Sequence, residues 1–197
     1  TPPMGINSHA GSTTVNGDVK VVLDGKRGGF NEYGAAGIYA HAGYGGAVGG
    51  TVNVNGNVDI SGVGNGLFAN IGGGTINVNG GKINIVDDNT DTGYSAIYST
   101  CGAINVNTVK DEKGNVIGAG NNKVDITGNV VVSVGAVNYV DCYEYSLVNL
   151  GLTTKDSQLT GVIYNEFPEG GKTASQGGNK KLFTGEANLW LQNGAQW

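Results

Sequence analysis

The chain has 197 residues, a formal net charge of −5, and no basic stripe with interleaved aromatic residues, so nucleic acid is not expected as a partner. No apolar run approaches the length of about 18 residues that a membrane-spanning helix needs. Glycine, at 37 of 197 residues, lacks the Gly-X-Y period of collagen. The regular spacing of valine and isoleucine argues against disorder, the other interpretation of a chain rich in glycine and asparagine.

Short segments along the chain alternate apolar and polar residues, which is typical of strands with one face turned inward. Four of them form a first set that can be aligned: Val19-Lys20-Val21, Val58-Asp59-Ile60, Ile83-Asn84-Ile85 and Val124-Asp125-Ile126. A second set follows in the same order: Gly37–Ala42, Gly66–Ile71, Ala96–Cys101 and Val137–Cys142. Strands that recur once per repeat stack in parallel, so the sequence predicts an all-β, right-handed parallel β-helix of about five to six coils.

The predicted coils cover residues 12–50, 51–73, 74–102 and 103–142, within a single domain that spans 1–197. The fourth coil carries extra residues around 110–121, whose charged and turn-forming side chains predict a protruding hairpin or loop. From Lys82 to Cys101 and from Lys123 to Cys142, the alignment holds a constant offset of 41 residues without a gap. Residues 143–197 differ in character from the regular coils and form an end stretch.

One column of this alignment is aromatic and holds Tyr39, Phe68, Tyr98 and Tyr139. Because the neighbouring apolar positions face inward, the aromatic side chains are expected on the outside, stacked at about 4.8 Å. Two interpretations stay open. The column is either a structural stack that stiffens the coils or an exposed strip that binds a sugar or a peptide.

The two cysteines, Cys101 and Cys142, share another column of the alignment. In register, their Cα atoms are expected within about 7 Å on adjacent coils. They are either bridged, as an oxidising compartment favours, or two thiols in the core. A catalytic cysteine is disfavoured because no histidine column accompanies either residue.

Evidence for a metal site or a catalytic group is weak. The segment 87–91 begins like a calcium-binding loop, but its sixth position is Thr92 rather than Gly and its twelfth is Tyr98 rather than Glu, so a solvated turn is favoured. His9 and His41 are isolated and lack the spacing of metal ligands. No serine-nucleophile motif is present. Asp59, Asn84 and Asp125 align in one outward column with Lys20, and this column is interpreted as a ladder on a solvated face rather than as the carboxylate pair or Asp/Lys/Arg cluster of a glycosidase or lyase. The sequence therefore predicts neither a cofactor nor an enzyme.

The end stretch resembles passenger domains of Gram-negative autotransporters. The similarity lies in Ser157-Gln158-Leu159-Thr160-Gly161 and, after a spacer, in Ala187-Asn188-Leu189-Trp190-Leu191-Gln192-Asn193-Gly194-Ala195-Gln196-Trp197. Strands such as Thr51-Val52-Asn53-Val54-Asn55-Gly56 fit the same family in a general way. The resemblance implies a right-handed β-helix displayed on the cell surface or outer membrane, or secreted, and a translocator barrel elsewhere in the parent chain.

The combined expectation is a fragment of an autotransporter adhesin that mediates adhesion or acts as a stalk. Its partner would be a glycan or protein on a host or bacterial surface, bound by loops that gather at one corner of the coils, as insertions in repeat proteins do. These loops are 24–34 and 87–92, and their charged residues are Lys26, Arg27, Glu32, Asp87, Asp88 and Asp91. The alternative function is a glycan-cleaving β-helix enzyme, either a polysaccharide lyase or a glycosidase.

Overall fold

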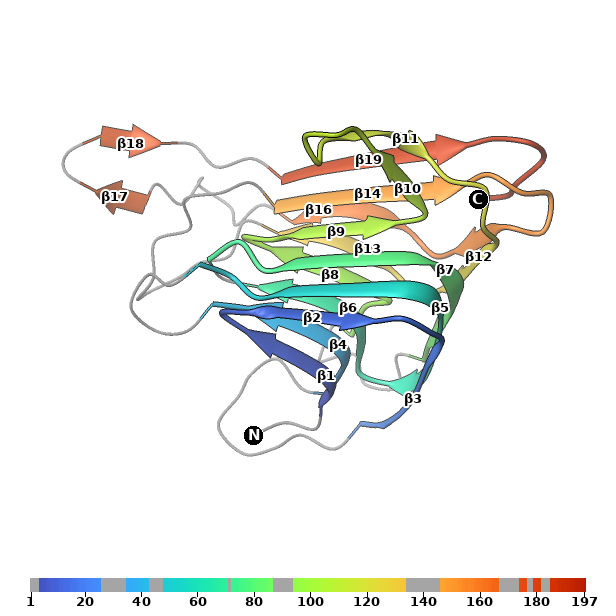
Figure 1. Cartoon of the computed structure of the whole chain (residues 1–197), viewed down its shortest axis with the longest axis horizontal. Coiled ribbons are helices and arrows are strands. Elements are labelled where there is room, and N and C mark those ends of the chain that lie inside the picture. Colours follow the sequence, from blue (N-terminus) through green and yellow to red (C-terminus); the bar gives the residue numbers. More distant parts are fainter. Residues whose placement is uncertain are drawn as a thin grey trace.

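The computed structural model describes residues 4–25, 35–42, 48–70, 72–86, 94–133, 146–166, 174–176, 179–181 and 185–197. These residues form an all-β structure without a helix (Figure 1). The first strands are β1 (Met4–His9), β2 (Ser12–Val15), β3 (Val19–Asp24), β4 (Ala36–His41), β5 (Thr51–Val63), β6 (Asn65–Asn70), β7 (Thr75–Ile85), β8 (Ile97–Thr100) and β9 (Ala103–Val106). The remaining strands are β10 (Thr108–Lys110), β11 (Val116–Ala119), β12 (Val124–Thr127), β13 (Val130–Ser133), β14 (Ser146–Leu152), β15 (Gln158–Thr160), β16 (Ile163–Glu166), β17 (Ala174–Gln176), β18 (Asn179–Lys181) and β19 (Gly185–Leu191).

The first large sheet has the order β1-β4-β6-β8-β13-β16, and all of its strands are parallel. The second large sheet is also parallel, and the long strands β5 and β7 run through both of its halves. One half stacks β2, β5, β7, β9, β14 and β19. The other half stacks β3, β5, β7, β12 and β15. Each stack therefore contains strands that recur at intervals along the chain, as Figure 1 shows from β1 up to β19.

The core lies between these stacks and consists of inward columns of aliphatic side chains. Ile38, Leu67 and Ile97 are paired neighbours in the first sheet, and each is completely buried. Equivalent columns contain Val52, Ile76 and Ile104 in one half of the second sheet and Ile60, Ile83 and Ile126 in the other half. Each buried side chain of this kind stabilises the fold by about 1.5–3 kcal/mol, so the alternation seen in the sequence is what holds the stacks together.

Glycine is required where neighbouring strands come closest. Gly81 has a φ of 118° and lies against Val58, whose carbonyl oxygen a Cβ at Gly81 would strike. A Cβ at Gly74 would likewise strike the carbonyl oxygen of Ala40. An L side chain at Gly81 would be strained in both respects, because this φ favours glycine and the space is already filled.

The alignment of 82–101 with 123–142 is wrong. Asp125 pairs with Lys82 rather than with Asn84, and Tyr98 pairs with Val131 rather than with Tyr139. The first error is a shift of two residues (84 − 82) and the second a shift of eight (139 − 131). The second arises because the corners differ in length: residues 86–96 separate β7 from β8, whereas only residues 128 and 129 separate β12 from β13. Both shifts are even and preserve the alternation, so the inward-facing positions of β7 and β12 were still identified.

The predicted hairpin within 110–121 is confirmed. Strands β10 and β11 pair with each other in an antiparallel ladder, and the hairpin also contacts β14 (Figure 1). At its turn the carboxylate of Asp111 accepts hydrogen bonds from the backbone N–H groups of Lys113 and Asn115, at 2.9 and 2.8 Å. Together with the Asn115 amide, these donors hold the pKa of Asp111 below its ordinary value.

Candidate functional site

The most regular polar surface lies on the outer side of β3, β5, β7, β12 and β15, and we call it the charged face. Its central row is made by residues that pair across the strands, in the order Lys20, Asp59, Lys82, Asp125 and Gln158. The charge alternates in sign along the first four positions. These side chains point outward because their chain neighbours, among them Val58, Ile60 and Ile83, occupy the core.

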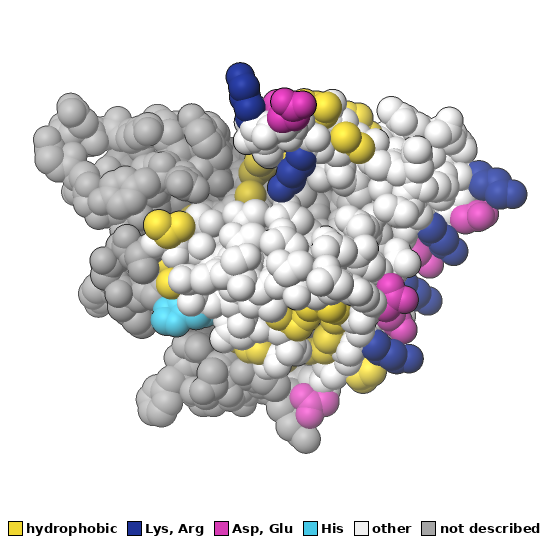
Figure 2. All heavy atoms as spheres, in the orientation of Figure 1, with side chains coloured by type: hydrophobic (Ala, Val, Ile, Leu, Met, Phe, Trp, Pro, Cys, Tyr) yellow, Lys and Arg dark blue, Asp and Glu magenta, His cyan; other side chains and the backbone are white. Residues whose placement is uncertain are grey.

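Contacts along this row join neighbouring strands. The Lys20 ammonium lies 3.5 Å from the Asp59 carboxylate, and both side chains remain largely exposed, at 75% and 51%. At the other end, the amide of Gln158 donates a hydrogen bond of 3.0 Å to Asp125. Figure 2 shows dark blue and magenta side chains interspersed along one edge of the molecule. Exposed pairs of this kind contribute only about 0–1 kcal/mol each, so the row is not needed to stabilise the fold.

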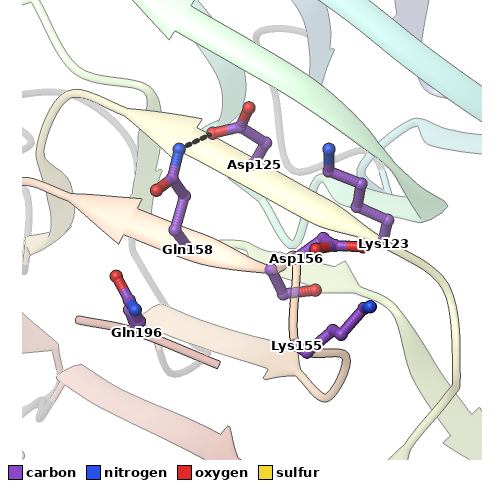
Figure 3. A pocket seen from close by; sticks show the side chains of 7 residues that line it. Lys123, Asp125, Lys155, Asp156, Gln158 and Gln196 are labelled. Atoms are coloured by element: carbon purple, nitrogen blue, oxygen red, sulfur yellow. Dashed lines mark hydrogen bonds between the residues drawn. The ribbon is translucent and has the colours of Figure 1, made fainter. Parts of the chain in front are cut away.

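The charged face ends in an open hollow of about 350 Å³ (Figure 3). Its lining is almost wholly polar and consists of Lys123, Asp125, Lys155, Asp156, Ser157, Gln158 and Gln196. Strand β12, the turn before β15 and the end of the chain each contribute to it. The structure thus brings together carboxylates and ammonium groups that are distant in the sequence. Asp125 is expected on an outward column from the sequence, but its grouping with Lys123, Lys155 and Asp156 was not predicted.

Ser157, one of the residues that line this hollow, has a structural role. It is buried, its hydroxyl accepts a hydrogen bond from the backbone N–H of Val124 at 3.1 Å, and it lies 2.8 Å from the Thr154 hydroxyl. A hydroxyl held between a backbone donor and a second hydroxyl has no adjacent general base, which a serine nucleophile requires. The hollow is therefore suited to binding polar groups through Lys, Asp and Gln side chains rather than to serine chemistry.

The two segments that carry the autotransporter-like motif meet beside this hollow. The backbone N–H of Leu159 donates to the carbonyl of Gln196 at 3.0 Å, and the N–H of Gln196 donates to the carbonyl of Ser157 at 3.1 Å. The indole N–H of Trp197 donates to the carbonyl of Gly161 at 3.2 Å. The end of the chain thus pairs alongside β15.

A ladder of asparagines occupies the neighbouring half of the second sheet. It runs through Asn53, Asn77, Asn105, Asn149 and Asn188, and each amide donates to the preceding side-chain oxygen at 2.8–3.0 Å. The hairpin lies close to this ladder, since Lys110 donates to Asn77 at 2.8 Å. Burial lowers the pKa of Lys110. The ladder connects stacked strands and leaves few amide groups for a ligand.

The aromatic column is only partly as predicted. Tyr39, Phe68 and Tyr98 are paired neighbours whose ring centroids lie 5.0 Å apart, and they lie on the side of the sheet opposite to the aliphatic core. The expectation that they are exposed is wrong for Phe68, which has no exposed surface. Val131 follows Tyr98 in the column in place of the predicted Tyr139, which lies outside the described residues. The geometry favours the structural stack over a binding strip.

The structure extends this stack with the two histidines that look isolated in the sequence. Strand β1 pairs with β4, which places the His9 ring 4.7 Å from the His41 ring, at an interplanar angle of 9°. The His41 ring also lies 4.3 Å from Tyr39, and its Nδ1 is 2.9 Å from the carbonyl oxygen of Ala42. Burial lowers the pKa of His41, and the nearby His9 acts in the same direction.

The remaining predicted site residues are only partly described. Lys26, Arg27, Glu32, Asp87, Asp88 and Asp91 lie outside the described residues, so the proposed binding loops stay a prediction. Cys101 is buried and disulfide-bonded. Cys142 lies outside the described residues, so the pairing of Cys101 with it also stays a prediction.

In the part of the chain that the structure describes, no group of three or more His, Cys, Asp or Glu side chains is placed to hold a metal ion. The same residues contain no helix long and apolar enough to cross a membrane. Comparisons with models of protein families, with curated proteins and with solved structures gave no match. The charged face and its hollow are the candidate functional site among the described residues.

Proposed function

We propose that the three stacks of parallel strands are the sides of a right-handed parallel β-helix. The proposal is supported by the way the chain visits the stacks in turn, as in β4, β5 and β6, and by the inward columns that run through each stack. The handedness follows the general rule for parallel crossover connections. The first coil then includes β1, which lies before residue 12, the start of the regular pattern in the sequence.

We further propose that this β-helix is a surface-displayed segment of an autotransporter adhesin, which mediates adhesion or acts as a stalk. The observation that carries the proposal is the charged face, whose central row lies in register across five strands, with Lys20, Asp59, Lys82 and Gln158 exposed and Asp125 half-buried. A regular exposed row that contributes little to stability suits contact with a partner. The resemblance of the end stretch to autotransporter passengers supplies the cellular setting.

The experiment has two parts, and the first concerns display. The parent gene is expected to encode a signal peptide and a C-terminal translocator barrel, and a tagged parent protein is expected to be accessible to antibody on intact cells. A tag that stays inside intact cells would contradict the proposal.

The second part tests binding by the segment. The purified chain is screened against arrays of glycans and matrix proteins, beside a D125A/D156A variant that alters the hollow. Adhesion through this face predicts a signal that the variant reduces. A stalk predicts no signal from either protein while surface display is retained.

One observation favours a second candidate, a glycan-cleaving enzyme. The hollow gathers Asp125 and Asp156 with Lys123 and Lys155. A pair of carboxylates is what glycosidase chemistry uses, and a lysine can serve as the general base of a lyase. Incubation with polysaccharides, followed by detection of new reducing ends or of unsaturated products, separates the two candidates. Turnover that is lost in D125A/D156A would favour the enzyme over the adhesin.

A further inference from the structure

The central row of the charged face is complementary in charge to the same row in reverse order. Lys20, Asp59, Lys82 and Asp125 lie on consecutive strands, β3, β5, β7 and β12. At about 4.8 Å between strands, the row is about 14 Å long. From Lys20 to Asp125 the charges are positive, negative, positive and negative, and in the reverse direction each sign is the opposite. A second copy of the row, laid against the first in reverse order, therefore places a positive charge against a negative charge at all four positions.

We propose that the charged face binds the charged face of a second copy of this chain, through a two-fold axis parallel to the strands and midway between β5 and β7. This arrangement places Lys20 against Asp125 of the second copy, and Asp59 against Lys82 of the second copy. A two-fold interface uses the same patch on both subunits, so each of these pairs occurs twice. The inference deepens the proposed adhesive function, on which it rests, by naming the partner.

A second row supports the same axis. Asp18 and Lys123 each lie two residues before a member of the central row, directly before β3 and β12, and both are exposed. Asp18 immediately precedes β3, the strand at one end of the row, and its carboxylate accepts the backbone N–H of Asn57 at 2.8 Å. Lys123 is at the other end, beside β12. Under the proposed axis Asp18 of one copy faces Lys123 of the other, so the second row is also complementary.

The rest of the face allows close approach. The row on the other side of the central one holds Val22, Ser61, Asn84, Thr127 and Thr160, which pair across the same strands. Most of these side chains are small and polar, and none of them is charged, so nothing in this row repels a second copy. Because these side chains are mostly short, they leave room for the charged rows of two copies to come into contact.

The interaction is expected to be weak and sensitive to salt. Exposed ion pairs contribute little individually, and a face of this size lies below the area of a stable protein interface. Many copies on one surface would raise the effective affinity through multivalency. Charge complementarity of this kind mainly sets the partner and the register.

Charge reversal provides the test. In K20D/K82D all four members of the central row are negative, and in D59K/D125K all four are positive. We expect the wild-type chain to self-associate reversibly at submillimolar to millimolar concentration in about 20 mM salt and to dissociate in about 0.5 M salt, where charges are screened beyond about 4 Å. Each variant alone is expected to lose this association by at least about tenfold. An equimolar mixture of the two variants is expected to regain it as a heterodimer.

Sedimentation velocity on the purified 197-residue chain measures these outcomes in solution, so they do not depend on surface display. E112K/K113D, which exchanges two charges on the hairpin, is the control and is expected to associate like the wild type. If circular dichroism shows that a reversed variant is unfolded, K20Q/K82Q and D59N/D125N replace it, and each is expected to weaken the association. A wild-type chain that stays monomeric at low salt, or a mixture of reversed variants that does not associate, would overturn the inference.

Discussion

Asn107 shows how one side chain positions a whole insertion. It lies where the chain leaves β9 for the hairpin, it is buried, and its φ of 52° lies in the left-handed region. Its amide donates to the carbonyls of Asn122 and Gly151 and to the Thr153 hydroxyl, and its side-chain oxygen accepts the backbone N–H of Asn122. One asparagine thus ties both ends of the insertion to β14 and the residue that follows it.

We predict that Asn107→Ala lowers the free energy of unfolding by about 2–4 kcal/mol, because it strands buried backbone groups and strains the backbone. Asn107→Gly is expected to cost less than Asn107→Ala, since glycine accepts the same φ. Chemical denaturation of both variants, with the exposed Asn121→Ala as control, measures the difference. Equal stability of wild type and Asn107→Ala would contradict the structural role.

The stacked histidines predict a dependence of stability on pH. Because the pKa of His41 is lowered in the folded state, the unfolded chain binds a proton at a higher pH than the folded chain does. The contribution of this group to stability is therefore fully present above the ordinary histidine pKa of about 6.5 and is lost as the pH falls through the lowered value.

We accordingly expect the thermal unfolding midpoint to fall between about pH 7 and pH 5, and the fall to be smaller in His41→Phe, which keeps the stack with Tyr39 but does not titrate. His9→Phe is the matched variant, because it removes the neighbouring charge and leaves His41 in place. The same slope with pH in wild type and in both variants would assign the dependence to other groups.

At the scale of elements, alternation in the sequence predicts which residues face inward but not which residues pair. Ile60, Ile83 and Ile126 were recognised as inward, yet Lys82 was missed as the neighbour of Asp59 and Asp125 because a shift of two residues leaves the pattern unchanged. Lys20, Asp59 and Asp125 are expected in one outward column from the sequence alone, but the alternation of charge depends on the register that places Lys82 between Asp59 and Asp125, and this was not predicted. The contact between His9 and His41 was also missed, because β1 lies before residue 12, where the regular pattern begins, and its pairing with β4 was not expected.

The hairpin is the element that should be easiest to remove. Its strands β10 and β11 pair only with each other among the described strands, and their ladder is separate from the large sheets. Replacing residues 108–120 by two glycines keeps Asn107 and Asn122 in place. We expect the strand signal in circular dichroism to remain and the free energy of unfolding to fall by about 1–3 kcal/mol, because β14 loses its contacts with the hairpin and Thr153 loses its hydrogen bond to the carbonyl of Gly120.

Hydrogen exchange then locates the effect of this deletion. Amides of β14, which the hairpin contacts, are expected to exchange faster, while those of β5 keep their protection. Global loss of the strand signal would show instead that the hairpin is integral to the fold.

At the scale of the whole molecule, each strand of a stack contacts mainly its two neighbours, so stability is expected to depend on position. Ile104, in β9, is fully buried between β7 and β14, whereas Leu23 belongs to β3, which pairs with β5 alone among the described strands. Nearest-neighbour stacking predicts that a cavity in the middle disrupts coupling on both sides, while a cavity at the end disrupts one side only.

We predict that Ile104→Ala lowers the free energy of unfolding by about 3–5 kcal/mol and broadens the denaturation transition, because the two ends then unfold less cooperatively. Leu23→Ala is expected to cost less, about 2–3 kcal/mol, and to leave the transition steep, since only the first strands are freed. Hydrogen exchange should show fast amides spreading from β9 in the first variant and confined to β1–β3 in the second. Equal losses with identical exchange patterns would mean that the stacks unfold as a single unit, and would contradict the coil-by-coil coupling expected of the proposed β-helix.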